Sequence, residues 1–216
     1  MTITAPHPSG SFPRRRRILL VDFGGVLIRC SDLALRQRWE TRLGLSEPLL
    51  SALFCSPLSA KALRGELLGE DVLSAFRDAH QLTADDMRLL WQDFWTPEAV
   101  NLRLLGVLSK LRPSVRIIVC SNFWSNWREI IIDRFDLAHV YDDIVVSADV
   151  GFVKPDARLF SLISEVYECP IHEIALLDDL ASVVNGARRV GVNAIHYQPE
   201  QGCEEAVLQW GETESP

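Results

Sequence analysis

The stretch ILLVDFGGVLI, residues 18–28, is the most informative part of the sequence for the fold. It contains a short apolar run that is followed by a single acid, Asp22. Residues 18–21 are all aliphatic, which is typical of a strand buried on both faces of a parallel sheet. Asp22 closes the run, and Gly24 and Gly25 follow where the chain must turn. A lone Asp after a strand is most often part of a turn or a helix cap, so its interpretation depends on the residues at the ends of the other strands.

Further apolar runs have the length and the Val, Ile and Leu content of buried strands. They are residues 115–122, 142–149, 173–179 and 193–197. Between or after them, helical periodicity covers 124–135, 156–168 and 181–191. Apolar strands that alternate with helices predict an α/β fold, a Rossmann-like parallel sheet with helices on both faces.

Residues 31–105 contain only amphipathic helical patterns, several of which begin at Ser, Thr, Asp or Pro. We therefore predict an all-helical cap inserted after the first strand of the sheet. The expected organisation is a disordered tail, a core made of two segments, the cap, and a C-terminal tail. These cover residues 1–13, then 14–30 with 106–200, then 31–105, and finally 201–216.

Polar side chains close the other predicted strands as well. Ser121 and Asn122 end one run, Asp178 and Asp179 end another, and Lys154 lies between them in GFVKPD. Ligands bind at the carboxyl ends of the strands in open parallel sheets, so these groups are expected to converge on Asp22. Three carboxylates close together repel one another unless a cation lies among them, and such oxygen ligands suit Mg²⁺.

This set of groups predicts phosphoryl chemistry. Asp22 could attack phosphorus and form an aspartyl-phosphate, while Ser121 and Lys154 hold the phosphate oxygens. Gly24 and Gly25 allow the backbone to approach metal and phosphate closely, and Asn122 is a further candidate phosphate-binding residue. The expected metal-binding positions are Asp22, Gly24, Asp178 and Asp179, with Gly24 contributing through its backbone.

In the same order, these motifs resemble those of the haloacid dehalogenase-like (HAD-like) hydrolase superfamily, in particular its branch with a helical cap after the first motif. VDFGGVL, IIVCSN, SADVGFVKPDARLF and IALLDDLASVVNGARRVG are similar to its four motifs, and the resemblance covers about residues 16–198. It implies that Asp22 is the nucleophile, that Ser121 and Lys154 contact phosphate, and that Asp178 and Asp179 bind magnesium.

One position departs from that pattern. Phosphatases of this superfamily usually carry a second Asp two residues after the nucleophile, where this chain has Gly24. That Asp protonates the leaving alcohol, and general acid–base help is worth about 10²–10⁴ in rate. We expect a magnesium-dependent phosphatase of a small, sugar phosphate-like metabolite. The first alternative is a noncatalytic or repurposed binding or regulatory protein, and the second is a haloacid dehalogenase, against which the Asp178–Asp179 pair argues.

The composition of the sequence limits the classes of binding partner that we expect. The formal net charge of −7 argues against nonspecific nucleic-acid binding, and no apolar run approaches the roughly 20 residues that span a membrane. Five widely spaced cysteines favour a reducing cytoplasm over a disulfide framework. We expect a monomer or homodimer with a small phosphorylated substrate. The candidate substrate contacts of the cap are Arg36, Arg38, Trp39 and Arg64.

Overall fold

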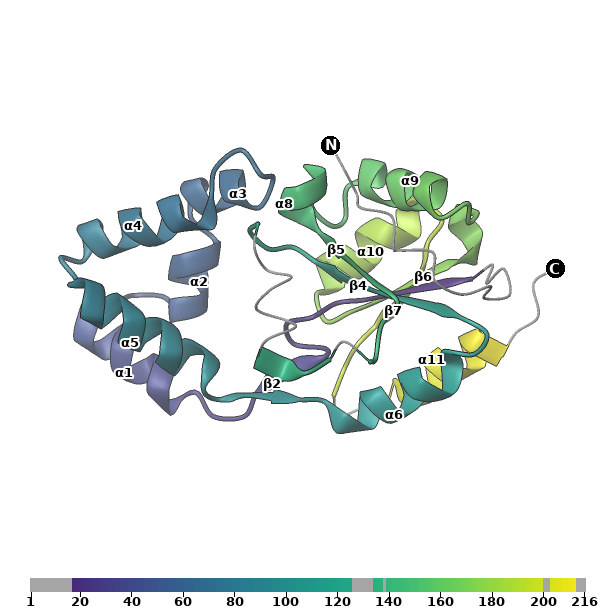
Figure 1. Ribbon diagram of the computed structural model, residues 1–216, viewed down its shortest axis with the longest axis horizontal. Coiled ribbons are helices and arrows are strands. Elements are labelled where there is room, and N and C mark those ends of the chain that lie inside the picture. The colour runs from purple at the N-terminus through teal and green to yellow at the C-terminus, as the bar shows by residue number, and fades with distance from the viewer. Residues whose placement is uncertain (1–16, 126–133, 138, 200–202, 213–216) are drawn as a thin grey trace.

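The structure is a computed structural model that describes residues 17–125, 134–137, 139–199 and 203–212 (Figure 1). Its central element is a five-stranded sheet in the order β5-β4-β1-β6-β7, in which every neighbouring pair is parallel. The strands are β1 Ile18–Val21, β4 Arg116–Ser121, β5 Asp143–Val146, β6 Ile174–Asp178 and β7 Asn193–His196. The predicted α/β fold with a parallel sheet is confirmed.

Helices cover both faces of this sheet, as predicted. Alternate residues of β1 point to opposite faces: Leu19 and Val21 pack in one apolar cluster, whereas Ile18 and Leu20 pack in another. The first cluster includes residues of α6 Leu102–Leu111 and α11 Glu204–Glu212, and the second includes residues of α9 Ala157–Val166 and α10 Ala181–Arg189. β1 is therefore buried on both sides, which explains its unbroken aliphatic sequence.

The cap lies to one side of the sheet and contains helices only (left in Figure 1). Its helices are α1 Ala34–Leu43, α2 Leu49–Phe54, α3 Pro57–Ala62, α4 Gly69–Ala79 and α5 Ala84–Trp95. Two short strands join it to the core: β2 Ile28–Cys30 pairs antiparallel with β3 Glu98–Val100. This β2–β3 ribbon was not predicted, because three residues are too few to show a strand pattern.

Two other segments differ from the sequence predictions. The run 142–149 was expected to be one strand, but β5 ends at Val146 and α8 Ser147–Val150 follows as one helical turn. Residues 201–216 were expected to be a tail, but α11 forms there and packs on α6, with Val207 fully buried.

A short 3₁₀ turn, η1 Ile171–Glu173, precedes β6. The expected tail 1–13 and most of the helix expected over 124–135 lie outside the described residues.

Trp124 connects the cap and the core. It follows β4, yet its indole Nε1 donates a hydrogen bond of 3.1 Å to the hydroxyl of Ser59 in cap helix α3. Its ring stacks on Phe54 of α2, with 4.7 Å between ring centroids. A Cβ added at Gly69 of α4 would lie 2.7 Å from the Trp124 ring, so only glycine fits there. The cap is therefore seated on the core by interlocking side chains.

Within the described residues, no helix is both long and apolar enough to cross a membrane. All five cysteines are free thiols in the structure.

Candidate active site

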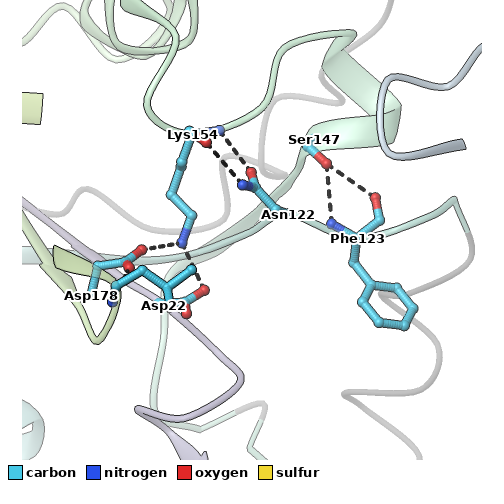
Figure 2. A network of polar contacts seen from close by, with 7 residues as sticks. Asp22, Asn122, Phe123, Ser147, Lys154 and Asp178 are labelled. Carbon is cyan, nitrogen blue, oxygen red and sulfur yellow. Dashed lines mark hydrogen bonds and ion pairs between the residues drawn. The ribbon is translucent and has the colours of Figure 1, made fainter. Parts of the chain in front are cut away.

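The candidate site lies at the carboxyl ends of β1, β4 and β6, where a buried lysine bridges two carboxylates (Figure 2). The Nζ of Lys154 lies 2.7 Å from Oδ1 of Asp22 and 2.7 Å from Oδ2 of Asp178. The side chains of Lys154 and Asp178 are almost completely buried. The predicted convergence of the strand-end residues is thus observed for these three groups.

The position of Asp22 is fixed by the central place of β1 in the sheet. Its backbone N–H donates to the carbonyl of Leu177 in β6 over 2.9 Å, which continues the ladder past the end of the strand. The chain then turns tightly, with hydrogen bonds from the N–H of Gly25 to the carbonyl of Ile28 and from the N–H of Ile28 to that of Phe23. The Asp22 side chain is thereby held at the carboxyl end of the central strand.

The two glycines after Asp22 have different roles. Gly25 has a φ of +81°, and a Cβ there would lie 2.2 Å from Oδ2 of Asp179. It is glycine both because of its left-handed backbone and because the Asp179 carboxylate lies against it. Gly24, in contrast, has an ordinary φ, and a Cβ added there would meet nothing within 4 Å. The missing side chain at Gly24 therefore leaves open space beside Asp22.

Asn122 holds the backbone of Lys154. Its side-chain amide donates to the Lys154 carbonyl over 3.0 Å and accepts from the Lys154 N–H over 2.7 Å. On the other side of the loop, a Cβ at Gly186 of α10 would lie 2.4 Å from Cγ of Pro155. Lys154 is thus positioned from both sides. Direct contact between Asn122 and phosphate stays a prediction, whereas its observed contacts are with the lysine backbone.

Ser121 ends β4, is buried, and borders the same cavity as Asp22 and Lys154. Its hydroxyl makes no hydrogen bond to the other residues that the structure describes, so it can donate to a ligand. The next residue but one, Phe123, is fixed through its backbone. The hydroxyl of Ser147 accepts from the Phe123 N–H and donates to the Phe123 carbonyl, each over 3.1 Å (Figure 2).

The acids can gather around a cation. One carboxylate oxygen from each of Asp22, Asp178 and Asp179 lies within 4.8 Å of the other two. The N–H of Leu180 donates to Oδ1 of Asp178 over 3.0 Å and orients that carboxylate. A cluster of hard oxygen donors of this kind fits Mg²⁺, which favours carboxylates and water. Gly24, the fourth expected metal-binding position, lines the same cavity and offers only backbone atoms.

Burial and mutual repulsion set the charges of the site. Burial, together with the charges of Asp178 and Asp179, raises the pKa of Asp22 to about 6, although the Lys154 ammonium opposes this shift. Burial and Asp178 also raise the pKa of Asp179. For Lys154, burial alone would lower the pKa, but Asp22 and Asp178 outweigh it and raise the pKa above its usual range. The lysine is therefore charged, and a further cation would stabilise the ionised form of the acids.

A cavity of about 400 Å³ opens between the sheet edge and the cap. It is lined by all of the predicted catalytic and metal-binding residues, with Gly25 and Asn122, and by apolar side chains of the cap. Arg36 also lines it, but its guanidinium is buried in an ion pair with Glu98 and donates to the carbonyl of Phe94. Its role is therefore to bind Glu98 of the β2–β3 ribbon.

Sequence reasoning missed several residues that shape the site. Ser147, Gly186 and Glu98 act through contacts between segments far apart in the chain, for which no local pattern exists. Phe54 and Phe94 carried a signal only as apolar positions of amphipathic helices, which indicates burial but not the cavity that they line.

Comparison with known proteins supports the fold. No protein-family model matches the sequence. Among curated proteins, drimenol cyclase drtB of Aspergillus calidoustus is 22% identical over 187 residues, which are 84% of this chain and 34% of that protein. The chain thus spans about a third of the length of that relative.

Solved structures are similar over most of their length. A HAD-like family hydrolase from Porphyromonas gingivalis superposes with a TM-score of 0.74 at 19% identity, covering 93% of this chain and all of the other. The HAD family enzyme bt-2542 of Bacteroides thetaiotaomicron, in complex with magnesium and inorganic phosphate, gives 0.70 at 15%, covering 84% and 94%. The L-2-haloacid dehalogenase RSc1362 gives 0.66 at 16%, covering 91% and 99%. The fold is therefore that of HAD-like hydrolases.

Proposed function

We propose that this protein, which has the fold of HAD-like hydrolases, is a magnesium-dependent phosphatase of a small phosphorylated metabolite. The observation that carries the proposal is the charge arrangement at the sheet edge. Three carboxylates lie within 4.8 Å of one another, and a buried lysine bridges two of them. Such an arrangement suits a divalent cation together with a phosphate group, because each offsets the charge of the other.

In the proposed reaction, a carboxylate oxygen of Asp22 attacks phosphorus, and the bond from phosphorus to the leaving alcohol oxygen breaks. Ser121 and Lys154 bind the phosphate oxygens as charge develops on them. Because Gly24 offers no acid, the departing alkoxide takes its proton from water. Water then attacks phosphorus as the bond from phosphorus to the Asp22 oxygen breaks, which releases inorganic phosphate and restores the Asp22 carboxylate. The proton that this water loses neutralises the hydroxide left when the alkoxide was protonated. Magnesium bound by Asp22, Asp178 and Asp179 would neutralise charge on the carboxylates and the phosphate.

The fold alone does not separate a phosphatase from a dehalogenase. A HAD family enzyme in complex with magnesium and inorganic phosphate and an L-2-haloacid dehalogenase both superpose on this chain. The adjacent carboxylates of Asp178 and Asp179 favour the phosphatase, because halide displacement needs no cation. The cyclase activity named for the curated relative forms no part of the proposal, since the chain covers only 34% of that protein. The alternative is a binding or regulatory role, which is favoured by the lack of an acid side chain at Gly24.

The test is phosphate release from a panel of phosphorylated metabolites, with magnesium and with a chelator. Asp22→Asn removes the nucleophile, and Asp85→Asn is its matched control, because Asp85 is a largely exposed acid of the cap. We expect magnesium-dependent turnover that Asp22→Asn abolishes and Asp85→Asn preserves. Turnover that is independent of magnesium, or that survives Asp22→Asn, would overturn the proposal.

A further inference from the structure

The cavity at the candidate site has two chemically unlike ends. The end at the carboxyl edge of the sheet carries the charged and hydroxyl groups of Asp22, Ser121 and Lys154, together with Asp178 at the end of β6 and Asp179 after it. The remainder of the lining is mainly apolar. Its principal side chains are Leu50, Phe54, Leu63, Phe94, Trp95 and Phe123. A phosphate occupies the first end under the proposed function, so the rest of the substrate must lie against the second.

The aromatic part of this lining is held in place by contacts among the protein's own side chains. The ring of Phe54 lies 5.0 Å from that of Phe123 and 5.8 Å from that of Phe94, measured between ring centroids. Phe123 is fixed by two hydrogen bonds between its backbone and the Ser147 hydroxyl, and Trp124 stacks on Phe54. Rings packed in this way offer a stable apolar surface without rearrangement, which favours binding of an apolar group.

The charged residues on the cap side do not make that end polar. Arg36 and Glu98 form an ion pair in which both side chains are more than nine-tenths buried. The Arg36 guanidinium also donates to the Phe94 carbonyl over 2.9 Å and lies 4.0 Å from the centroid of the Phe94 ring. These contacts direct the pair toward itself and Phe94, so the lining offers little to the several hydroxyls of a sugar.

From this lining we infer that the substrate is a phosphate monoester of an apolar alcohol; the inference rests on the proposed function. The charged end binds the phosphate, and the aromatic and aliphatic wall covers a hydrocarbon group of the alcohol. A sugar hydroxyl placed against the Leu and Phe side chains of this wall, which offer neither a donor nor an acceptor, would lose its water without gaining a partner, which is unfavourable. The inference replaces the sugar phosphate-like substrate expected from the sequence.

The test compares two primary phosphate esters that share a six-membered ring: cyclohexylmethyl phosphate and glucose 6-phosphate. Acetyl phosphate serves as a small third probe for phosphatase activity itself. We expect magnesium-dependent hydrolysis of cyclohexylmethyl phosphate with a kcat/KM at least about tenfold above that of glucose 6-phosphate, the effect of one unsatisfied hydroxyl or more. A smaller ratio with acetyl phosphate hydrolysed would overturn this inference and leave the proposed function standing. No magnesium-dependent hydrolysis of any probe would overturn both.

A pair of cap variants ties the preference to the wall. Leu50 of α2 lines the cavity and is half exposed, so Leu50→Gln is compatible with folding. Leu89 of α5 is exposed to a similar degree and does not line the cavity, which makes Leu89→Gln the control. We expect Leu50→Gln to reduce the ratio of the two kcat/KM values about threefold or more. An unchanged ratio in Leu50→Gln, or an equal fall in Leu89→Gln, would overturn the inference.

Discussion

The ammonium group of Lys154 lies 2.7 Å from Oδ1 of Asp22, so the candidate nucleophile forms an ion pair with this lysine. The same ammonium lies 2.7 Å from Asp178, and it therefore compensates two buried carboxylates at once. Removing one partner of a buried pair leaves an uncompensated charge, which typically costs about 3–5 kcal/mol.

Lys154→Met is accordingly expected to lower the free energy of unfolding by about 3 kcal/mol or more in the presence of a chelator. Urea denaturation measures this. Added Mg²⁺ should restore more stability to the variant than to the wild type, because it meets a site with more uncompensated negative charge. Lys110→Met, at an exposed position of α6, is the matched control. Equal stability of Lys154→Met and Lys110→Met would show that the ion pair contributes nothing to folding.

Gly24→Asp should restore the general acid and base. The position is sterically open, and its φ lies outside the left-handed range that favours glycine, so the variant is expected to fold like the wild type. For esters with a poor leaving group, we expect kcat to rise about 100-fold. Hydrolysis of acetyl phosphate, whose leaving group needs little protonation, should change far less.

The matched control for that variant is Gly25→Asp. Its side chain would begin 2.2 Å from the Asp179 carboxylate and would require a left-handed backbone. We expect it to lose both stability and activity. A wild type that hydrolyses nothing beside an active Gly24→Asp would indicate a pocket retained for binding or regulation. No gain in Gly24→Asp would mean that Asp at this position cannot reach the leaving group.

The strands and most of the site could be predicted because both are recorded locally. A strand buried on both faces is an unbroken aliphatic run, and Asp22, Ser121 and Asp178 each stand where such a run ends. The order of these ends in a parallel sheet then brings the groups together. The cap was predictable for a similar reason, since its helices carry amphipathic patterns and recognisable first residues.

What could not be predicted depends on contacts between distant segments. The β2–β3 ribbon exists because Ile28 lies opposite Val100, and neither three-residue strand has a pattern of its own. Likewise, α11 is stabilised by packing on α6, where Val207 is fully buried. Its sequence alone does not show that contact, so these residues were predicted to be a tail. The hydrogen bond from the Asn122 side chain to the Lys154 carbonyl joins residues 32 positions apart, and no local sequence pattern in either motif predicts it.

Glycines in two helices provide a test of how tightly the Lys154 loop is held. Gly186 of α10 is buried against Pro155, and Gly186→Ala would place its Cβ 2.4 Å from the proline ring. We expect overpacking to cost about 1–3 kcal/mol of stability and to displace Lys154, with loss of turnover. Gly106 of α6 is exposed and has nothing within 4 Å, so Gly106→Ala should instead stabilise the protein by about 0.5–1 kcal/mol. Thermal unfolding and phosphate release of both variants distinguish packing from helix propensity; a stabilised, fully active Gly186→Ala would contradict the contact.

The hydrogen bond between Trp124 and Ser59 provides the last test, because it joins the cap to the core. Ser59 is fully buried and Trp124 nearly so. Ser59→Ala leaves the indole N–H without its described partner, and we expect a loss of about 1–3 kcal/mol in the free energy of unfolding. Ser46→Ala, at an exposed cap position, should change stability little.

Trp124→Phe and the double variant complete a thermodynamic cycle that separates the hydrogen bond from the loss of ring contacts. Residues in direct contact typically show a coupling of about 0.5–3 kcal/mol, measured by urea denaturation of the four proteins. A coupling in that range would mean that the cap's seat on the core depends on this bond. Additive effects of the two substitutions would instead assign the seat to the stacking of Trp124 on Phe54, whose ring centroids lie 4.7 Å apart.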